Sequence, residues 1–238
     1  KLATFNGNID DENPSPAHSS SSGKRKRNAS SSSSSSASKR QKYEEEVVAG
    51  KILFEDGMAL YWATDFKTID EVTGQLMIES AASVGFPMAI AYCTYYGWNG
   101  YVMDIDEAFK LFMDCSDYSY AQYMLGHCYF DGYGVDQDVK EAVKWYTKAA
   151  NAGDSDAQYD LGRCYANGRG VDKDYKKAVK WYTKAANAGN SVAQFNLGNC
   201  YEDGHGVDKD YKKAVKWYTK AANAGYSYAQ NHLRDRYY

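Results

Sequence analysis

The feature that most constrains how this 238-residue chain can fold is a block of sequence that recurs every 36 residues. Residues 171–189 read VDKDYKKAVKWYTKAANAG, and residues 207–225 repeat all 19 letters. Residues 135–153 match 16 of the 19. A period of roughly 20 to 50 residues is typical of solenoids, in which each unit buries its apolar face only by stacking against its neighbours.

A second repeating unit lies between these blocks and predicts the first helix of a pair, here called helix A. It reads AQYMLGHCYFDGYG, AQYDLGRCYANGRG and AQFNLGNCYEDGHG in its three copies. In the middle copy we expect helix A over residues 154–167, with Ala157, Leu161 and Cys164 on its buried side. Gly162 lies mid-helix, where glycine costs about 1 kcal/mol relative to alanine. Its recurrence predicts a close approach of two helices.

The nearly invariant block predicts the second helix of each pair, helix B. Asp174 precedes it and is a good N-cap, because its carboxylate can accept a hydrogen bond from a free backbone N–H. Ala178, Trp181, Tyr182 and Ala185 form its expected apolar side. Glycine ends both helices, since it tolerates positive φ.

The repeats divide the chain into four segments. Residues 118–225 hold three near-identical copies, and residues 226–238 begin a fourth as AQNHL, which we expect to be a capping helix. Residues 44–117 contain weaker matches and are predicted to be degenerate helical repeats that form an N-terminal cap. Residues 1–43 are expected to be a disordered tail, because a Ser-rich stretch with almost no apolar residues cannot offset the entropy of ordering.

The tail is basic and the body is acidic: residues 1–43 carry a net charge of +5, and the remainder −8. Two basic clusters in the tail are separated by 11 residues, a pattern that predicts a bipartite signal for a nuclear import receptor. A solvating charged linker is the alternative. We therefore expect an intracellular location, with the nucleus favoured over the cytoplasm. The signal residues are Lys24, Arg25, Lys26, Arg27, Lys39, Arg40 and Lys42.

The two repeating blocks together resemble the Sel-one-like repeat family, a class of tetratricopeptide-like helical repeats. The resemblance rests on A-Q-x-x-L-G-x-x-Y-x-x-G-x-G-V followed by K-A-V-K-W-Y-x-K-A-A, and it is strong over residues 118–225. It implies an all-α, right-handed α-solenoid of stacked helix-turn-helix repeats. It also implies a concave surface that binds a protein or peptide, as in an adaptor that assembles complexes.

Differences between the near-identical copies suggest where a partner binds. Helix B hardly varies, whereas helix A varies at positions spaced i, i+4 and i+7, which share one stripe of a helix. We call these positions the helix-A face and predict that they contact the partner; an unconstrained solvated surface is the alternative. They are Tyr120, Met124, His127, Asp156, Asp160, Arg163, Val192, Asn196 and Asn199.

Several chemistries suggested by the composition are not expected. Cys128, Cys164 and Cys200 recur once per repeat, and equivalent helices are about 8–10 Å or more apart, too far for thiolates to share one metal ion. No nucleophile–base set is recognisable. We therefore expect no catalytic residue, no metal and no cofactor. The acidic body opposes nucleic acid binding at the solenoid, and no apolar stretch is long enough to span a membrane.

These patterns predict a non-catalytic scaffold that binds a protein or peptide along the helix-A face. Because the chain begins with Lys1 rather than Met, one alternative is that it is the regulatory or targeting fragment of a larger signalling enzyme.

Overall fold

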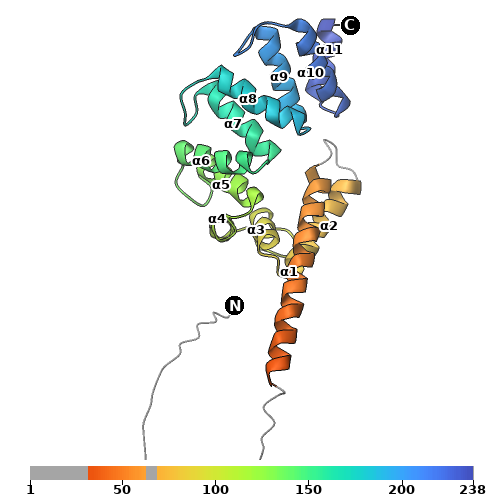
Figure 1. The fold of residues 1–238 in the computed structure, drawn as a ribbon, viewed down its shortest axis with the longest axis vertical. Coiled ribbons are helices and arrows are strands. Elements are labelled where there is room, and N and C mark those ends of the chain that lie inside the picture. The colour runs from red at the N-terminus through yellow and green to blue at the C-terminus, as the bar shows by residue number, and fades with distance from the viewer. Residues whose placement is uncertain (1–31, 63–68, 238) are drawn as a thin grey trace, which may run out of the picture. The chain divides into compact units, whose positions relative to one another are not determined.

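The computed structural model describes residues 32–62 and 69–237 (Figure 1). Within those residues the regular elements are all α-helices. This confirms the fold class expected from the sequence. The helices are α1 (Ser32–Trp62), α2 (Ile69–Ser83), α3 (Pro87–Tyr96), α4 (Ile105–Asp114), α5 (Ser119–Asp131), α6 (Val139–Asn151), α7 (Ser155–Asn167), α8 (Tyr175–Asn187), α9 (Ser191–Asp203), α10 (Tyr211–Asn223) and α11 (Ser227–Tyr237).

Part of the expected tail is helical. Residues 1–31, which include the first basic cluster, lie outside the described residues, but α1 begins at Ser32 and so includes residues 32–43. Extending an existing helix is much less costly than nucleating one. Pairs of side chains four residues apart also support the helix: Gln41 donates to Glu45 at 3.2 Å, and Lys42 lies 3.7 Å from Glu46. The compact body begins at Gln41, close to its expected start at residue 44.

Three helix pairs of equal length form the central repeats, α5/α6, α7/α8 and α9/α10, and each helix has 13 residues. The expected boundaries are confirmed. Helix α7 ends at Gly168, whose φ is 73°, and α8 begins after Asp174. The carboxylate of Asp174 accepts a hydrogen bond from Lys177 N at 3.0 Å. Local sequence signals thus set the C-terminus of α7 and the N-terminus of α8.

A glycine in each helix A makes room for a tyrosine ring of helix B. A Cβ atom at Gly162 would lie 2.6 Å from Cδ1 of Tyr182, well inside normal van der Waals contact. The same relationship recurs for Gly126 with Tyr146 and for Gly198 with Tyr218. The predicted close approach is confirmed, and its cause is the packing of an aromatic ring against the helix backbone.

Each pair stacks on the next through contacts of α6 with α7 and of α8 with α9. The core that includes Ala149, Ala157, Leu161 and Cys164 is built mainly from small and aliphatic side chains. All five cysteines of the chain are buried and free. Cys164 therefore packs as a small apolar residue, as the sequence predicted.

Helices α1 to α4 precede the central repeats and share a core with the start of α5. Gly57 brings α1 close to α2, since a Cβ there would lie 2.8 Å from the backbone oxygen of Gly74. Phe54, on the same side of α1, packs edge-on against Tyr92 and Tyr120 with ring centroids about 6 Å apart. Residues of α1 and α3 therefore reach the first central repeat.

The chain ends on α11, which packs against α10. Glu202 of α9 is buried and accepts a hydrogen bond from the Tyr218 hydroxyl of α10 at 2.7 Å. It also anchors α11, because it lies 3.2 Å from His232 Nε2 and forms an ion pair with Arg236. Residues 227–237 thus form a terminal helix at the position where the sequence predicted a cap.

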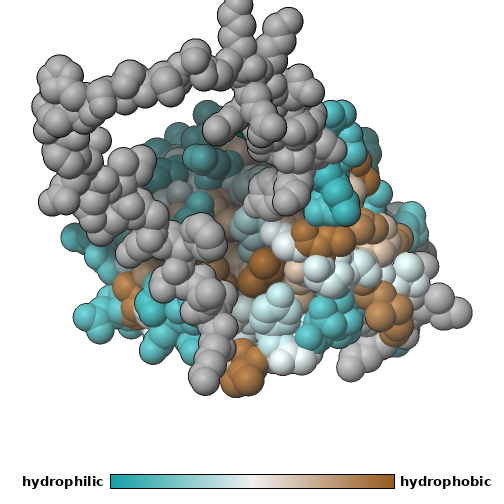
Figure 2. Space-filling view, turned by 90° about the horizontal axis from the view of Figure 1, so that it is seen from below, coloured by the Kyte–Doolittle hydropathy of each residue, from teal (hydrophilic) through white to brown (hydrophobic). Residues whose placement is uncertain are grey.

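Hydrophobic and hydrophilic side chains are interspersed on the face seen in Figure 2. Among the described side chains of α1 and α2, the large apolar residues that are exposed are Val48, Ile52, Val72 and Leu76. They occur as pairs four residues apart rather than as a long stripe.

Candidate functional site

The nine residues of the helix-A face lie on α5, α7 and α9, three on each helix, but they are not equally accessible. Met124 and Asp160 are only 5% and 7% exposed. Arg163 is exposed, and the other six are half-buried. Much of this face therefore joins one repeat to the next, and only part of it is available to a partner.

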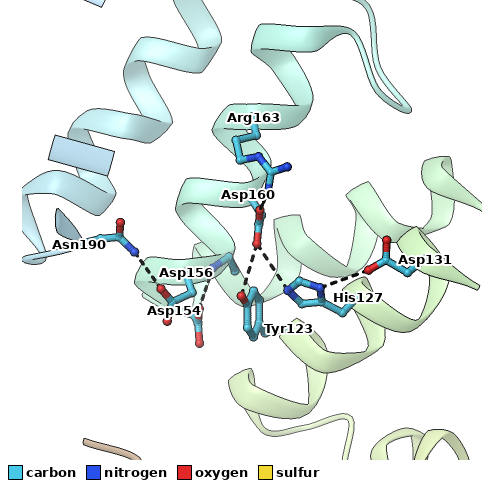
Figure 3. A network of polar contacts seen from close by, with 9 residues as sticks. Tyr123, His127, Asp131, Asp154, Asp156, Asp160, Arg163 and Asn190 are labelled. Atoms are coloured by element: carbon cyan, nitrogen blue, oxygen red, sulfur yellow. Dashed lines mark hydrogen bonds and ion pairs between the residues drawn. The ribbon is translucent and has the colours of Figure 1, made fainter. Parts of the chain in front are cut away.

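Asp160 is the centre of a polar network between α5 and α7 (Figure 3). Arg163 Nη1 lies 2.8 Å from its Oδ1. Across the repeat boundary, His127 Nε2 lies 3.5 Å from its Oδ2, and the Tyr123 hydroxyl donates to the same oxygen at 3.4 Å. Asp131 lies 3.8 Å from the other ring nitrogen of His127. The predicted residues His127, Asp160 and Arg163 are thus brought together, and they fix adjacent repeats to each other.

A second polar link joins α7 to α9. Asn190 accepts from Ala193 N at 2.8 Å, which caps α9, and its amide donates to Asp156 Oδ1 at 2.8 Å. Burial and the nearby charge of Asp160 raise the pKa of Asp156. Burial also raises the pKa of Asp154, the N-cap of α7, to about 6. Negative charge is therefore concentrated at the N-terminal end of α7.

One hollow on the helix-A face lies between α7 and α9. It has a volume of about 210 Å³, and we call it the polar cleft. Three predicted residues, Arg163, Asn196 and Asn199, line it together with Asn167 and His205. The Asn199 side-chain amide lies 2.7 Å from the Tyr218 hydroxyl, and this contact uses one of the amide's two polar atoms. The polar cleft therefore presents a guanidinium group and several amide groups.

Another hollow is an enclosed cavity of about 70 Å³, which we call the tyrosine pocket. The predicted residues Tyr120, Met124 and Asp156 line it. Three further residues that the sequence interpretation did not include complete it: Met58, Tyr92 and Tyr123. An aromatic residue recurs at the position of Tyr123, which was a usable signal. Nothing in the sequence linked Met58 or Tyr92 to this face.

The tryptophans of helix B lie on other surfaces. Trp181 is half-buried, and Lys184 of the same helix lies 4.0 Å from its ring centroid. Trp145 and Trp217 are covered in the same way by Lys148 and Lys220. These rings pack against their own helices and do not form an open stacking surface.

The sequence pattern of the Sel1 repeat matches residues 84–112, 119–154, 155–190 and 191–226, which together make up more than half of the chain. The chain belongs to the Sel1 repeat family. The first Sel1 repeat covers α3 and α4, so part of the degenerate region 44–117 is a repeat in its own right. The other three Sel1 repeats coincide with the pairs α5/α6, α7/α8 and α9/α10.

Solved structures of other Sel1 repeat proteins have the same fold. A Sel1 repeat protein from Oxalobacter formigenes is 35% identical, with a TM-score of 0.61 over 80% of this chain and 75% of that one. The protein c5321, described as a protective antigen of uropathogenic Escherichia coli, is 27% identical with a TM-score of 0.63. The match covers 83% of this chain but only 41% of c5321. Comparison with curated proteins found no match.

Sel1 repeat proteins generally mediate protein–protein interactions and are typically non-catalytic. Within residues 32–62 and 69–237, no group of three or more His, Cys, Asp or Glu side chains is placed to hold a metal ion. Over the same residues, no helix combines the length and apolar character needed to cross a membrane. Burial raises the pKa of Cys164 and Cys200 to about 11, so these thiols remain protonated near neutral pH.

Proposed function

We propose that this Sel1 repeat protein is a non-catalytic scaffold whose partner is an extended protein segment bound along the accessible part of the helix-A face. The observation that carries the proposal is the polar cleft. Side-chain amides there can both donate to and accept from a peptide backbone, and the residues that line it are among those that differ between otherwise near-identical repeats.

The geometry supports a segment that crosses from one repeat to the next. The polar cleft takes Arg163 from α7 and Asn196 and Asn199 from α9. The hydrogen bond from Asn190 to Asp156 holds those two helices together. A binding surface fixed in this way loses little entropy when the partner binds.

The test is a comparative pull-down with the full chain and a triple variant, Arg163→Ala, Asn196→Ala and Asn199→Ala. Met124 and Asp160 stay unchanged because they are buried. The matched control replaces three exposed lysines of helix B, Lys144, Lys180 and Lys216, with alanine. We expect the control to retain a partner that the cleft variant loses. Equal recovery by the cleft variant and the wild type, with both helical by circular dichroism, would place binding elsewhere.

We also propose that the basic tail directs the chain to the nucleus. Arg40 and Lys42 of the second cluster are exposed, which supports access by a receptor. Because both lie in α1, the start of that helix must unwind for the cluster to bind in an extended form. The measurement is the nuclear fraction of a fluorescent fusion in which both clusters are changed to alanine. An unchanged nuclear fraction would contradict the proposal.

A further inference from the structure

The tyrosine pocket has an unusual lining for a cavity inside a helical repeat. It lies where α1, α3, α5 and α7 meet, with Met58, Tyr92 and Met124 nearly inaccessible to solvent. Its 70 Å³ is room for about two water molecules. That is also enough for the end of one slender side chain.

The lining suits a positive charge. Three tyrosine rings surround the pocket, and the faces of aromatic rings attract cations. Two methionine thioethers add polarisable contacts. Asp156 supplies the one carboxylate of the lining, which can form a charge-assisted hydrogen bond with an ammonium group.

Within residues 32–62 and 69–237, burial and the charge of Asp160 raise the pKa of Asp156 and outweigh His127, which lowers it. Among the described residues, no Lys or Arg forms an ion pair with Asp156, and its hydrogen bond comes from the neutral amide of Asn190. Burial also raises the pKa of Tyr120, and Asp154, Asp156 and Glu55 add to that increase. Asp156 is half-buried, and removing a carboxylate from water without pairing it is costly, so a bound cation would stabilise it.

A second hollow borders the pocket on the same face. An adjoining open cleft of about 330 Å³ shares Tyr120 and Asp156 with the pocket, and Asp154 lines it too. In Figure 3 the carboxylates of Asp154 and Asp156 lie close together at one end of α7. A cation drawn to this end of α7 therefore meets the residues that border the enclosed cavity.

We propose that the tyrosine pocket binds the primary ammonium group of a lysine side chain presented by the partner segment. The proposal rests on the proposed function, because it requires a protein partner on the helix-A face. The small volume favours a primary ammonium group over a trimethylated one, which carries three additional methyl groups. The proposal adds a chemical requirement to the partner: a lysine positioned to enter between Tyr120 and Asp156.

The test uses n-butylammonium, which has the charge and length of a lysine side chain, and the full chain with ¹³C-labelled methionine methyl groups. We expect saturable chemical-shift changes at Met58 and Met124 in the millimolar range. Met103 and Met113, which are exposed, serve as internal controls and should not move. n-Butanol and tetramethylammonium at equal concentration should produce shifts at least fivefold smaller.

Two variants make the test decisive. Asp156→Asn keeps the shape of the side chain and should weaken n-butylammonium binding at least tenfold, whereas Asp172→Asn in an exposed loop should not change it. Tyr120→Val, which introduces the residue that Val192 places at the equivalent position of α9, should weaken binding severalfold. Equal shifts with n-butanol, or unchanged affinity in Asp156→Asn, would overturn the proposal. Putrescine binding far more tightly than n-butylammonium would also overturn it, because the ligand would then be a free polyamine.

Failure of this proposal is distinguishable from failure of the scaffold proposal. If n-butylammonium does not bind but the polar-cleft variant still loses its partner, only the lysine pocket is wrong. If n-butylammonium binds as expected but partner recovery is the same for the polar-cleft variant and the Asp156→Asn variant as for the wild type, the pocket binds cations without serving a partner on this face. That outcome would refute both the proposed function and the lysine assignment.

Discussion

The Tyr182 ring packs directly against Gly162, so that a Cβ atom on the glycine would lie 2.6 Å from Cδ1 and 2.7 Å from Cε1 of the ring. Both residues are buried, and both recur at the same positions in the neighbouring repeats. The contact is thus the steric element that sets the distance between helix A and helix B.

Replacing Gly162 with alanine should destabilise the chain, although alanine is the better helix former by about 1 kcal/mol. The added methyl group must displace the Tyr182 ring, and such overpacking costs about 1–3 kcal/mol. We expect a net loss of about 1 kcal/mol in the free energy of unfolding, measured in urea. A double-mutant cycle with Tyr182→Ala is the control, because the alanine at 162 should cease to destabilise once the ring is gone. A more stable Gly162→Ala single variant would contradict this account.

Asp160→Asn should weaken the packing of the second Sel1 repeat against the third and so lower the free energy of unfolding. Asp160 is buried and interacts with Arg163, His127 and Tyr123. Removing its charge takes away the ionic partner of Arg163, and the loss should be about 1–3 kcal/mol in the free energy of unfolding. Asp203→Asn, an exposed carboxylate whose nearest ion pair is 3.9 Å from His205, should leave the stability unchanged. Equal effects from both substitutions would show that the network adds nothing beyond surface charge.

Asp154→Asn should stabilise the chain at neutral pH. Burial raises the pKa of Asp154 to about 6, so the unfolded chain releases this proton at lower pH than the folded chain does. The contribution of Asp154 to the free energy of unfolding therefore falls as the pH rises from about 4 to 6, and this contribution stays low above that range. Asparagine also caps helices well, and Asn190 does so at the equivalent position of α9.

The expected gain for Asp154→Asn at pH 7 is on the order of 3 kcal/mol, and the two proteins should be equally stable below about pH 3.5. Thermal or urea unfolding across this pH range measures the difference. A gain that does not depend on pH would mean that titration of Asp154 is not its cause.

The five cysteines should react slowly with a thiol reagent in the folded chain. All are buried, and burial raises the pKa of Cys93 and of Cys128 to about 12, so the reactive thiolate is scarce at pH 8. All five should react at once in guanidinium chloride. A rapid phase in the native protein would show that at least one cysteine is accessible and activated.

How much of this structure could be predicted from the sequence depends on the range of the interactions. The helix ends follow from Asp174, Gly168 and their equivalents, because capping involves residues within one turn of each other. The register of the repeats follows from the 36-residue period. The helical start of α1 was not predicted, because a Ser-rich stretch with almost no apolar residues offers little burial, and its composition does not show that a longer helix follows.

For the candidate site, the repeat comparison identified α5, α7 and α9 and brought out Arg163, Asn196 and Asn199, which do line one cleft. It could not show that Met124 and Asp160 are buried. Divergence between copies marks residues at the boundaries of repeats as readily as residues that face solvent.

The sequence by itself determined the helix pairs, their spacing and their stacking, since local periodicity and repetition encode these directly. Only the tertiary structure decided that Met58 of α1 and Tyr92 of α3 meet Tyr120 and Asp156 in one cavity. That meeting depends on how the divergent N-terminal helices pack against the first regular repeat. The contact joins segments that are far apart in the sequence and share no repeated pattern. The periodicity of the chain therefore could not predict it.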